Sequence, residues 1–316
     1  MMEEDILRFP EQLKFQPVIT NGEKLKPSFS FIVCGMGGSH LSSDLIKAYD
    51  PSLSIHIHHD YGIPDLPSDI LDKSLFIASS YSGNTEEAID FARLAGEKNY
   101  NILIITSGGE LLKTAKEEKV PYIALTHSNL EPRMALGYSA MAMFKAMGLE
   151  NGVTELHSLA DTIKPESMKN EGKTIGESLV NKIPIIYSSL RNLGLAYVWK
   201  IKFNETAKIP AFSNSFPELN HNEIAGFEEN SFPFTFLFIK DNSDHPKIIK
   251  RMEATKELYE SKGFPVALTE LKGKTVMEKI FNSLLLADWV SLAVAKEKGV
   301  DPESVPMIEE FKKMVE

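Results

Sequence analysis

The sequence of 316 residues is poor in cysteine, has fewer basic than acidic residues, and has no long hydrophobic run. Cys34 is its one cysteine, so no disulfide can form within the chain, which fits a reducing compartment. The 34 Lys and Arg are outnumbered by 44 Asp and Glu. The net charge of −10 argues against a nucleic-acid-binding protein, because such proteins usually carry a basic face.

Signals for export or membrane insertion are also missing from the sequence. Its start, MMEEDILRFPEQ, is acidic where a signal peptide would be basic and then apolar. The longest apolar runs, such as residues 232–239, are too short to span a bilayer. We therefore expect a cytoplasmic protein that neither crosses nor binds a membrane.

Short apolar runs alternate with helical patterns along most of the chain. Strands are predicted at 29–35, 54–60, 73–80, 101–107, 121–126, 183–189, 232–240 and 264–271. Helices are predicted at 84–99, 131–148, 192–208, 245–263 and 276–299. Strands separated by helices indicate an α/β fold, with mainly parallel sheets flanked by helices.

The alternation is interrupted once, in the polar and strandless residues 149–182. We place a domain boundary there, giving an N-terminal domain of residues 1–153 and a C-terminal domain of residues 154–316. The stretches FIVCGMGGSHLSSDLI and PIIYSSLRNLGLAYVW each read as strand, loop and helix. This similarity suggests two related α/β halves.

The stretch CGMGGSH, residues 34–40, follows a predicted strand and opens a helix. Its glycines allow a ligand to approach the main chain, and the helix start favours an anion. A dinucleotide fingerprint would need a small residue at the position of His40, and no Gly-Lys-Ser/Thr of a P-loop follows. The alternative is a tight turn without a ligand.

A second loop, SSYSGNTEE at residues 79–87, also lies between a strand and a helix. Its Ser80, Ser82 and Thr85 hydroxyls can cap the helix or donate to phosphate oxygens. Both loops would meet at the carboxyl edge of one parallel sheet, where α/β proteins bind ligands. Neither contains Lys or Arg, which fits a sugar phosphate better than a nucleotide with its metal.

Together, GMGGS and SYSGNTEE resemble the motifs of the sugar isomerase (SIS) domain. The whole chain is similar to the bifunctional phosphoglucose/phosphomannose isomerases, with further support from EPRMALGYS (131–139), residues 202–227 and KGVDP (298–302). The resemblance implies two SIS domains, a homodimer, a hexose 6-phosphate substrate, and neither a metal nor a nucleotide cofactor.

The resemblance also implies roles for individual residues. The phosphate would be held by Gly37, Gly38, Ser39, Ser80, Ser82 and Thr85. Arg133 would stabilise the enediolate, and Glu205 would move a proton between C2 and C1. His221 would open the sugar ring from the partner subunit.

A lysine of the last helix would assist ring opening. We assign Lys312 within IEEFKKMV, with Lys313 as the competing choice. The family often has Thr after the DP of KGVDP, a position linked to handling both epimers, and this chain has Glu303 and Ser304 there.

The residue types suit the chemistry. A partly buried carboxylate can remove a proton next to a carbonyl, a fixed guanidinium lowers the energy of an anionic intermediate, and histidine exchanges protons near neutral pH. The alternatives are a surface Glu205, an ion-paired Arg133 and a structural His221.

Other readings remain for the site and for the whole protein. HIHHD, residues 56–60, has residue types that bind metals, but alternate strand residues point to opposite faces, so we expect no metal site. SIS domains can also act as non-catalytic sensors of phosphosugars. A third reading is an isomerase of a different sugar phosphate.

Overall fold

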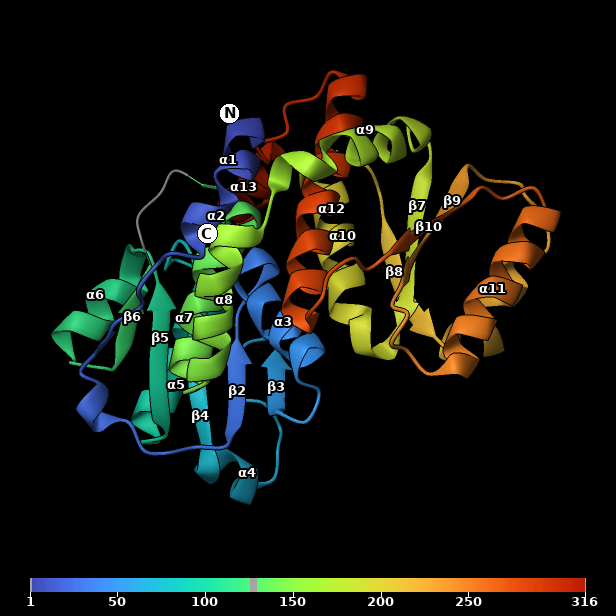
Figure 1. Cartoon of the computed structure of the whole chain (residues 1–316). Coiled ribbons are helices and arrows are strands. Elements are labelled where there is room, and N and C mark those ends of the chain that lie inside the picture. The colour runs from blue at the N-terminus through green and yellow to red at the C-terminus, as the bar shows by residue number, and fades with distance from the viewer. Residues whose placement is uncertain (1, 126–129, 316) are drawn as a thin grey trace. The chain divides into compact units, whose positions relative to one another are not determined.

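The computed structural model describes residues 2–125 and 130–315 (Figure 1). The chain divides into two compact units. The first unit is Arg8–Ile163, and the second unit combines Met1–Leu7 with Lys164–Glu316. The boundary predicted at residue 153 lies within the helix α8 (Glu150–Thr162), ten residues before Ile163, the last residue of the first unit.

A six-stranded sheet forms the centre of the first unit, with the order β1-β6-β5-β4-β2-β3. Its parallel strands are β2 (Ser30–Cys34), β3 (Ser54–His58), β4 (Ser74–Ser80), β5 (Asn101–Thr106) and β6 (Tyr122–Ala124). These strands were predicted, although the end of the predicted strand 121–126 lies outside the described residues. The short β1 (Ile19–Thr20), which pairs antiparallel with β6, was not predicted.

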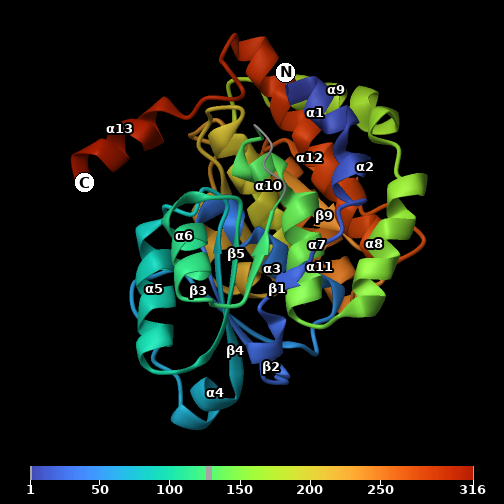
Figure 2. The same cartoon turned by 90° about the vertical axis from the view of Figure 1, so that its left-hand side faces the viewer.

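Helices cover both faces of this sheet (Figure 2). They are α2 (Phe9–Gln12), α3 (Leu41–Tyr49), α4 (Ser68–Lys73), α5 (Glu86–Glu97), α6 (Gly109–Glu117), α7 (Leu136–Ala146) and α8. The apolar faces of α5 and α6 pack Phe91 and Leu111 against Ile32 and Phe76 of the sheet. Helices α3 and α7 pack together, and Figure 2 shows α7 and α8 opposite α5 and α6.

The second unit has a smaller sheet of four parallel strands in the order β10-β9-β7-β8. The strands are β7 (Ile183–Ser189), β8 (Phe212–Phe216), β9 (Phe234–Lys240) and β10 (Val266–Glu270). Strand β8 was not predicted, because its sequence FSNSF is short and half polar. An aromatic cluster around Tyr187, Phe236 and Tyr259 fills one side of this sheet.

The helices of the second unit are α1 (Met2–Leu7), α9 (Lys169–Ser178), α10 (Leu193–Glu205), α11 (Pro246–Ser261), α12 (Val276–Lys298) and α13 (Pro306–Val315). Helix α11 covers one face of the sheet, and α9, α10 and α12 lie on the other (Figure 1). Helix α9 approaches α12 closely, since a Cβ on Gly172 would come within 2.4 Å of the Trp289 Cβ.

Helix α13 and the lengths of the helices bear on the exposed and apolar parts of the described chain. The described residues of α13 are all exposed, and Figure 2 shows it projecting from the rest of its unit. Among the helices of residues 2–125 and 130–315, none combines the length and apolarity needed to cross a bilayer.

Candidate active site

The two predicted loops lie side by side in the first unit. Strands β2 and β4 are parallel neighbours, with Cys34 opposite Ala78, so the loops after them meet at the carboxyl edge of the sheet. They are joined directly, because the Ser79 hydroxyl donates to the Ser39 carbonyl over 2.7 Å. The Tyr81 N–H in turn donates to the Ser39 hydroxyl over 3.1 Å. The expected convergence of the loops is confirmed.

The first loop is a tight turn, residues 37–39, that requires glycine. Gly37 has a φ of 51°, which disfavours larger residues. A Cβ on Gly38 would lie 2.9 Å from the Pro132 carbonyl carbon and 3.0 Å from the Arg133 nitrogen. The backbone of the first loop therefore touches the short 3₁₀ helix η3 (Pro132–Met134) that carries Arg133.

Arg133 is almost fully buried, with 1% of its side chain exposed. Its Nη1 lies 3.4 Å from a carboxylate oxygen of Glu131, which is itself partly exposed. A guanidinium keeps its charge even when buried. The structure thus brings a positive charge to the segment in contact with the first loop; the role of Arg133 in stabilising the enediolate stays a prediction.

The second loop is ordered by its own hydroxyl groups. The Ser80 and Thr85 hydroxyls lie 2.7 Å apart, and the Gly83 N–H donates to Ser80 Oγ over 3.1 Å. Ser82 Oγ accepts from the Asn84 N–H over 3.3 Å. Thr85 precedes α5 but its side chain does not cap the helix. Since the Ser39 and Ser82 oxygens accept N–H bonds, their hydroxyl hydrogens can be donated to a ligand.

A third loop, after β5, supports the second one and was not predicted. The Ser107 hydroxyl and N–H both donate to the Tyr81 carbonyl, over 2.6 and 3.1 Å. A Cβ on Gly83 would lie 1.8 Å from the Gly108 carbonyl oxygen, so the two loops fit only with glycine there. The Ser-Gly-Gly after a strand, similar to the first loop, is the sequence signal that could have indicated it.

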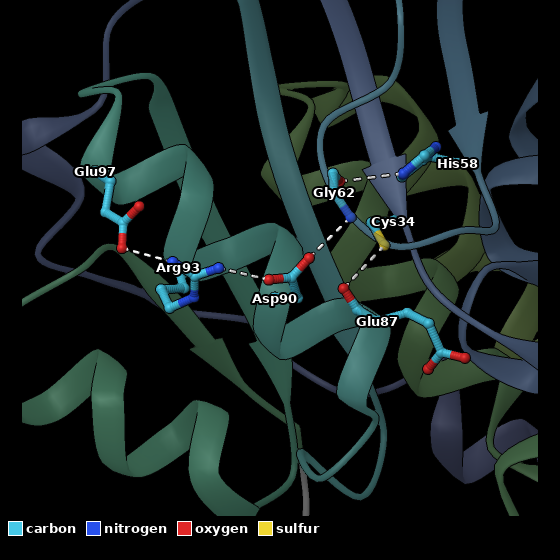
Figure 3. A network of polar contacts seen from close by, with 7 residues as sticks. All are labelled: Cys34, His58, Gly62, Glu87, Asp90, Arg93 and Glu97. Carbon is cyan, nitrogen blue, oxygen red and sulfur yellow. Dashed lines mark hydrogen bonds and ion pairs between the residues drawn. The ribbon is translucent and has the colours of Figure 1, made fainter.

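Polar contacts also join α5 to the segment after β3 (Figure 3). Asp90 accepts from the Gly62 N–H over 2.9 Å and from Arg93 over 2.7 Å. The hydrogen bond from Arg93 lowers the pKa of Asp90. On β2, burial raises the pKa of the Cys34 thiol to about 12, so this group stays protonated and unreactive near neutral pH.

Two histidines lie next to the first loop. His40 Nδ1 is 2.6 Å from an Asp44 carboxylate oxygen, and the His40 ring centroid is 4.2 Å from that of His59. His59 Nδ1 lies 3.4 Å from the Gly35 carbonyl oxygen. Burial and then the nearby His40 lower the pKa of His59.

A second histidine of the HIHHD stretch, besides His59, also contacts backbone carbonyls. His58 Nε2 lies 3.2 Å from the Gly62 carbonyl oxygen (Figure 3). In the part of the chain that the structure describes, no three His, Cys, Asp or Glu side chains gather in a way that could hold a metal ion.

Glu205 lies in the second unit, as the last residue of α10, and its side chain is half-buried. Its carbonyl oxygen accepts a hydrogen bond from the Lys208 ammonium. One turn earlier, the buried Lys202 forms an ion pair with the buried Asp288 of α12. The sequence predicted a partly buried glutamate at a helix end, and this placement is confirmed; its role as base stays a prediction.

His221 also lies in the second unit, exposed at the end of the 3₁₀ helix η6 (Glu218–His221). Two residues later, Glu223 accepts hydrogen bonds from the Tyr187 hydroxyl and the Asn214 amide. Burial, then the bond to Glu223, raises the pKa of Tyr187, so its hydroxyl stays protonated and donates. The segment after His221 is therefore anchored to β7 and β8.

The last predicted residue, Lys312, is exposed on α13 and forms a 2.8 Å ion pair with Glu309. The structure thus gathers the two predicted loops and Arg133 in the first unit. Glu205, His221 and Lys312 lie on three separate elements of the second unit.

Known proteins resemble this chain in sequence. The model of the bacterial phospho-glucose isomerase C-terminal SIS domain matches residues 168–315. The bifunctional phosphoglucose/phosphomannose isomerase of Thermoplasma volcanium is 31% identical, over 99% of this chain and 98% of that protein. The protein of the same name from Caldicellulosiruptor bescii is 33% identical, over 98% of each chain.

The fold is shared with solved structures as well. Tagatose-6-phosphate ketose/aldose isomerase from Escherichia coli superposes with a TM-score of 0.70 at 16% identity, covering 95% of this chain and 94% of that one. At this identity the likeness shows the fold alone. Together with relatives above 30% identity over nearly the whole length, the order of the motifs shows that the chain belongs to the bifunctional phosphoglucose/phosphomannose isomerase family.

Proposed function

We propose that this chain is an aldose–ketose isomerase that interconverts glucose 6-phosphate and mannose 6-phosphate with fructose 6-phosphate. The observation that carries the proposal is the pair of joined loops after β2 and β4. They bring small hydroxyls and backbone N–H groups together, and these are donors that can bind the phosphate of a sugar. The relatives that match along the whole chain support the same substrate class.

In this proposal Gly37, Gly38, Ser39, Ser80, Ser82 and Thr85 hold the phosphate. His221 opens the sugar ring by moving a proton between the ring oxygen and the oxygen on C1, and Lys312 assists. The exposure of His221 and Lys312 supports a role at an interface. We therefore retain a homodimer in which His221 serves the partner's site.

Glu205 then acts as the base. Its carboxylate takes the proton from C2 of the open aldose, the electrons form a C1–C2 double bond, and the C1 oxygen becomes anionic. The buried guanidinium of Arg133 stabilises this enediolate while a proton passes from the C2 oxygen to the C1 oxygen. Glu205 then returns its proton to C1, and the C2 oxygen becomes the carbonyl of the ketose. Because C2 is planar in the enediolate, glucose and mannose 6-phosphates lead to the same intermediate.

The reaction moves one hydrogen within the substrate, so the proposal includes no redox cofactor and no resident metal. From the composition we also expect a cytoplasmic enzyme.

Replacing Glu205 by Gln tests the central step. The amide keeps the shape of the side chain but cannot accept the C2 proton, so we expect kcat to fall about 10²–10⁴-fold. Glucose 6-phosphate should still bind, as measured by titration calorimetry, since the phosphate loops are unchanged. Turnover of both aldose phosphates should be followed with a chelator present.

Glu257→Gln, an exposed position of α11, is the matched control and should keep full activity. Substantial turnover by E205Q would refute its role as base. If the wild-type chain binds sugar phosphates but turns none over, it is a non-catalytic sensor. Turnover of another sugar phosphate alone would retain the chemistry and change the substrate.

A further inference from the structure

A buried ion pair joins α10 to α12. Lys202 and Asp288 are 1% and 2% exposed, and the Lys202 ammonium contacts Asp288 Oδ1 directly. Desolvating two charges is so costly that apolar residues of similar size are often as stabilising as the pair, or more so. Stability alone therefore does not account for this buried ion pair.

Its position on α10 suggests a further reason. Lys202 precedes Glu205 by three residues, and residues at this spacing share one side of a helix. The Lys202 carbonyl oxygen accepts the Thr206 N–H over 2.9 Å and so closes the last turn. The side chain that contacts α12 and the proposed base thus belong to the same turn.

Other contacts hold the chain on either side of this turn. One turn earlier, Trp199 Nε1 donates to the Ser283 hydroxyl over 3.0 Å, which is a second polar link between α10 and α12. Beyond the turn, the Lys208 ammonium donates to the Glu205 carbonyl and the Lys298 ammonium to the Lys208 carbonyl, the latter over 3.0 Å. The Lys202–Asp288 pair links the turn itself to α12.

We propose that Lys202 and Asp288 are positioning residues for Glu205, and that their ion pair sets the rotation and height of the last turn of α10 against α12. This inference rests on the proposed function. A proton transfer between carbons demands close placement of the base, and an error of about 1 Å can cost about 10²-fold in rate. The pair acts through Glu205 and does not itself exchange a proton with the sugar.

The test replaces both charges at once, as K202M/D288L. The double variant removes both charges of the pair together, so its melting temperature should be equal to or above that of the wild type. We expect kcat for fructose 6-phosphate to fall about 10–100-fold, with KM within about threefold because the phosphate loops lie in the other unit. Damage to the fold would instead change the melting temperature and KM together.

Two further variants complete the design. K202R keeps the ion pair and should recover most of kcat, whereas K202M alone leaves a buried carboxylate and should be less stable than the double variant. The matched control is K279M/D241N, which removes another pair of α12, with an N–O distance of 2.7 Å and little exposure. This control should keep the wild-type kcat.

The outcomes separate the two proposals. An active wild type, an inactive E205Q and a K202M/D288L variant within twofold of the wild-type kcat would overturn the positioning role alone. A wild type without isomerase activity would overturn the proposed function and this inference with it. A kcat loss in K202M/D288L with unchanged KM and stability, absent from the control, supports the inference.

Discussion

Each unit contains a strand followed by a 3₁₀ turn and a helix, but the residues of the two turns differ. In the first unit, β2 leads through the 3₁₀ turn η2 (Gly37–Ser39) into α3; in the second, β7 leads through η5 (Leu190–Asn192) into α10. The first turn contains two glycines and a buried serine. The second contains Leu190, 68% exposed, and Arg191. Both are strand, turn and helix, yet only the first turn contains glycines, at which a ligand can approach the main chain closely.

The proposed function places its residues at opposite ends of the two helices. In the first unit the proposed phosphate donors lie at the start of the helix, where N–H groups and the helix dipole favour anions. In the second unit the proposed base, Glu205, lies at the last residue of α10. In the proposed function, one architecture therefore serves substrate binding at one helix end and proton transfer at the other.

Gly38→Ala, in the first turn, should have the largest effect of the substitutions on substrate binding and stability. The added methyl would lie 2.9 Å from the Pro132 carbonyl carbon, so either the loop or η3 must move. We expect KM for glucose 6-phosphate to rise at least about tenfold, a loss of about 1.4 kcal/mol in binding. Overpacking should lower the free energy of unfolding by about 1–3 kcal/mol. Steady-state kinetics and chemical denaturation measure the two effects.

Leu190→Ala, in the corresponding turn of the second unit, is the control. This side chain is exposed, so both KM and stability should stay near the wild-type values. Equal effects of the two substitutions would show that the first turn has no special part in binding.

The alternation of strands and helices could be predicted because buried parallel strands are continuous apolar runs. Strand β8 and helix α6 were missed, since FSNSF and GELLKTAKE are both rich in polar residues. Tertiary contacts, not local pattern, decide these elements. The sequence signal for the domain boundary is also weak, because the helical pattern of α8 continues through residue 153.

The phosphate loops could be predicted because glycines and hydroxyls after two strands form a local pattern. The supporting role of Ser107 could not, since it depends on β5 lying beside β4. The Lys202–Asp288 pair joins residues 86 positions apart, and nothing in the sequence links them. Contacts of this kind follow from strand order and helix packing.

Tyr187→Phe tests how the second unit holds its own functional segment. The first unit fixes its loops by hydroxyl bonds to backbone, whereas here a buried hydroxyl binds the Glu223 carboxylate two residues after His221. Losing a buried hydrogen bond to a charged group should lower the free energy of unfolding by about 1.5–3 kcal/mol. We also expect a severalfold lower kcat, because the His221 segment loosens. Unchanged kinetics in Y187F would separate this anchor from the function of His221.

The smallest expected effect is a difference in acid sensitivity between the units. The pKa of His59 is lowered by burial and by His40, with Asp44 and His58 also nearby. Its folded pKa is below the unfolded value near 6.5, so the stability it contributes is present above that pH and is lost as pH falls through the folded value.

Asp241, in the second unit, also has a lowered pKa: burial opposes the shift, but hydrogen bonds from Lys279 and Ser243 outweigh it. Its contribution is present above the unfolded value near 3.8 and is lost only below it. Between pH 7 and 5, therefore, His59→Asn should flatten the fall in melting temperature and Asp241→Asn should leave it unchanged. Below pH about 4, Asp241→Asn should be the variant that flattens the fall in melting temperature, because the Asp241 carboxylate of the wild type then takes up a proton. Thermal unfolding across this range checks both variants, and a full acid slope retained by H59N would assign the sensitivity to other groups.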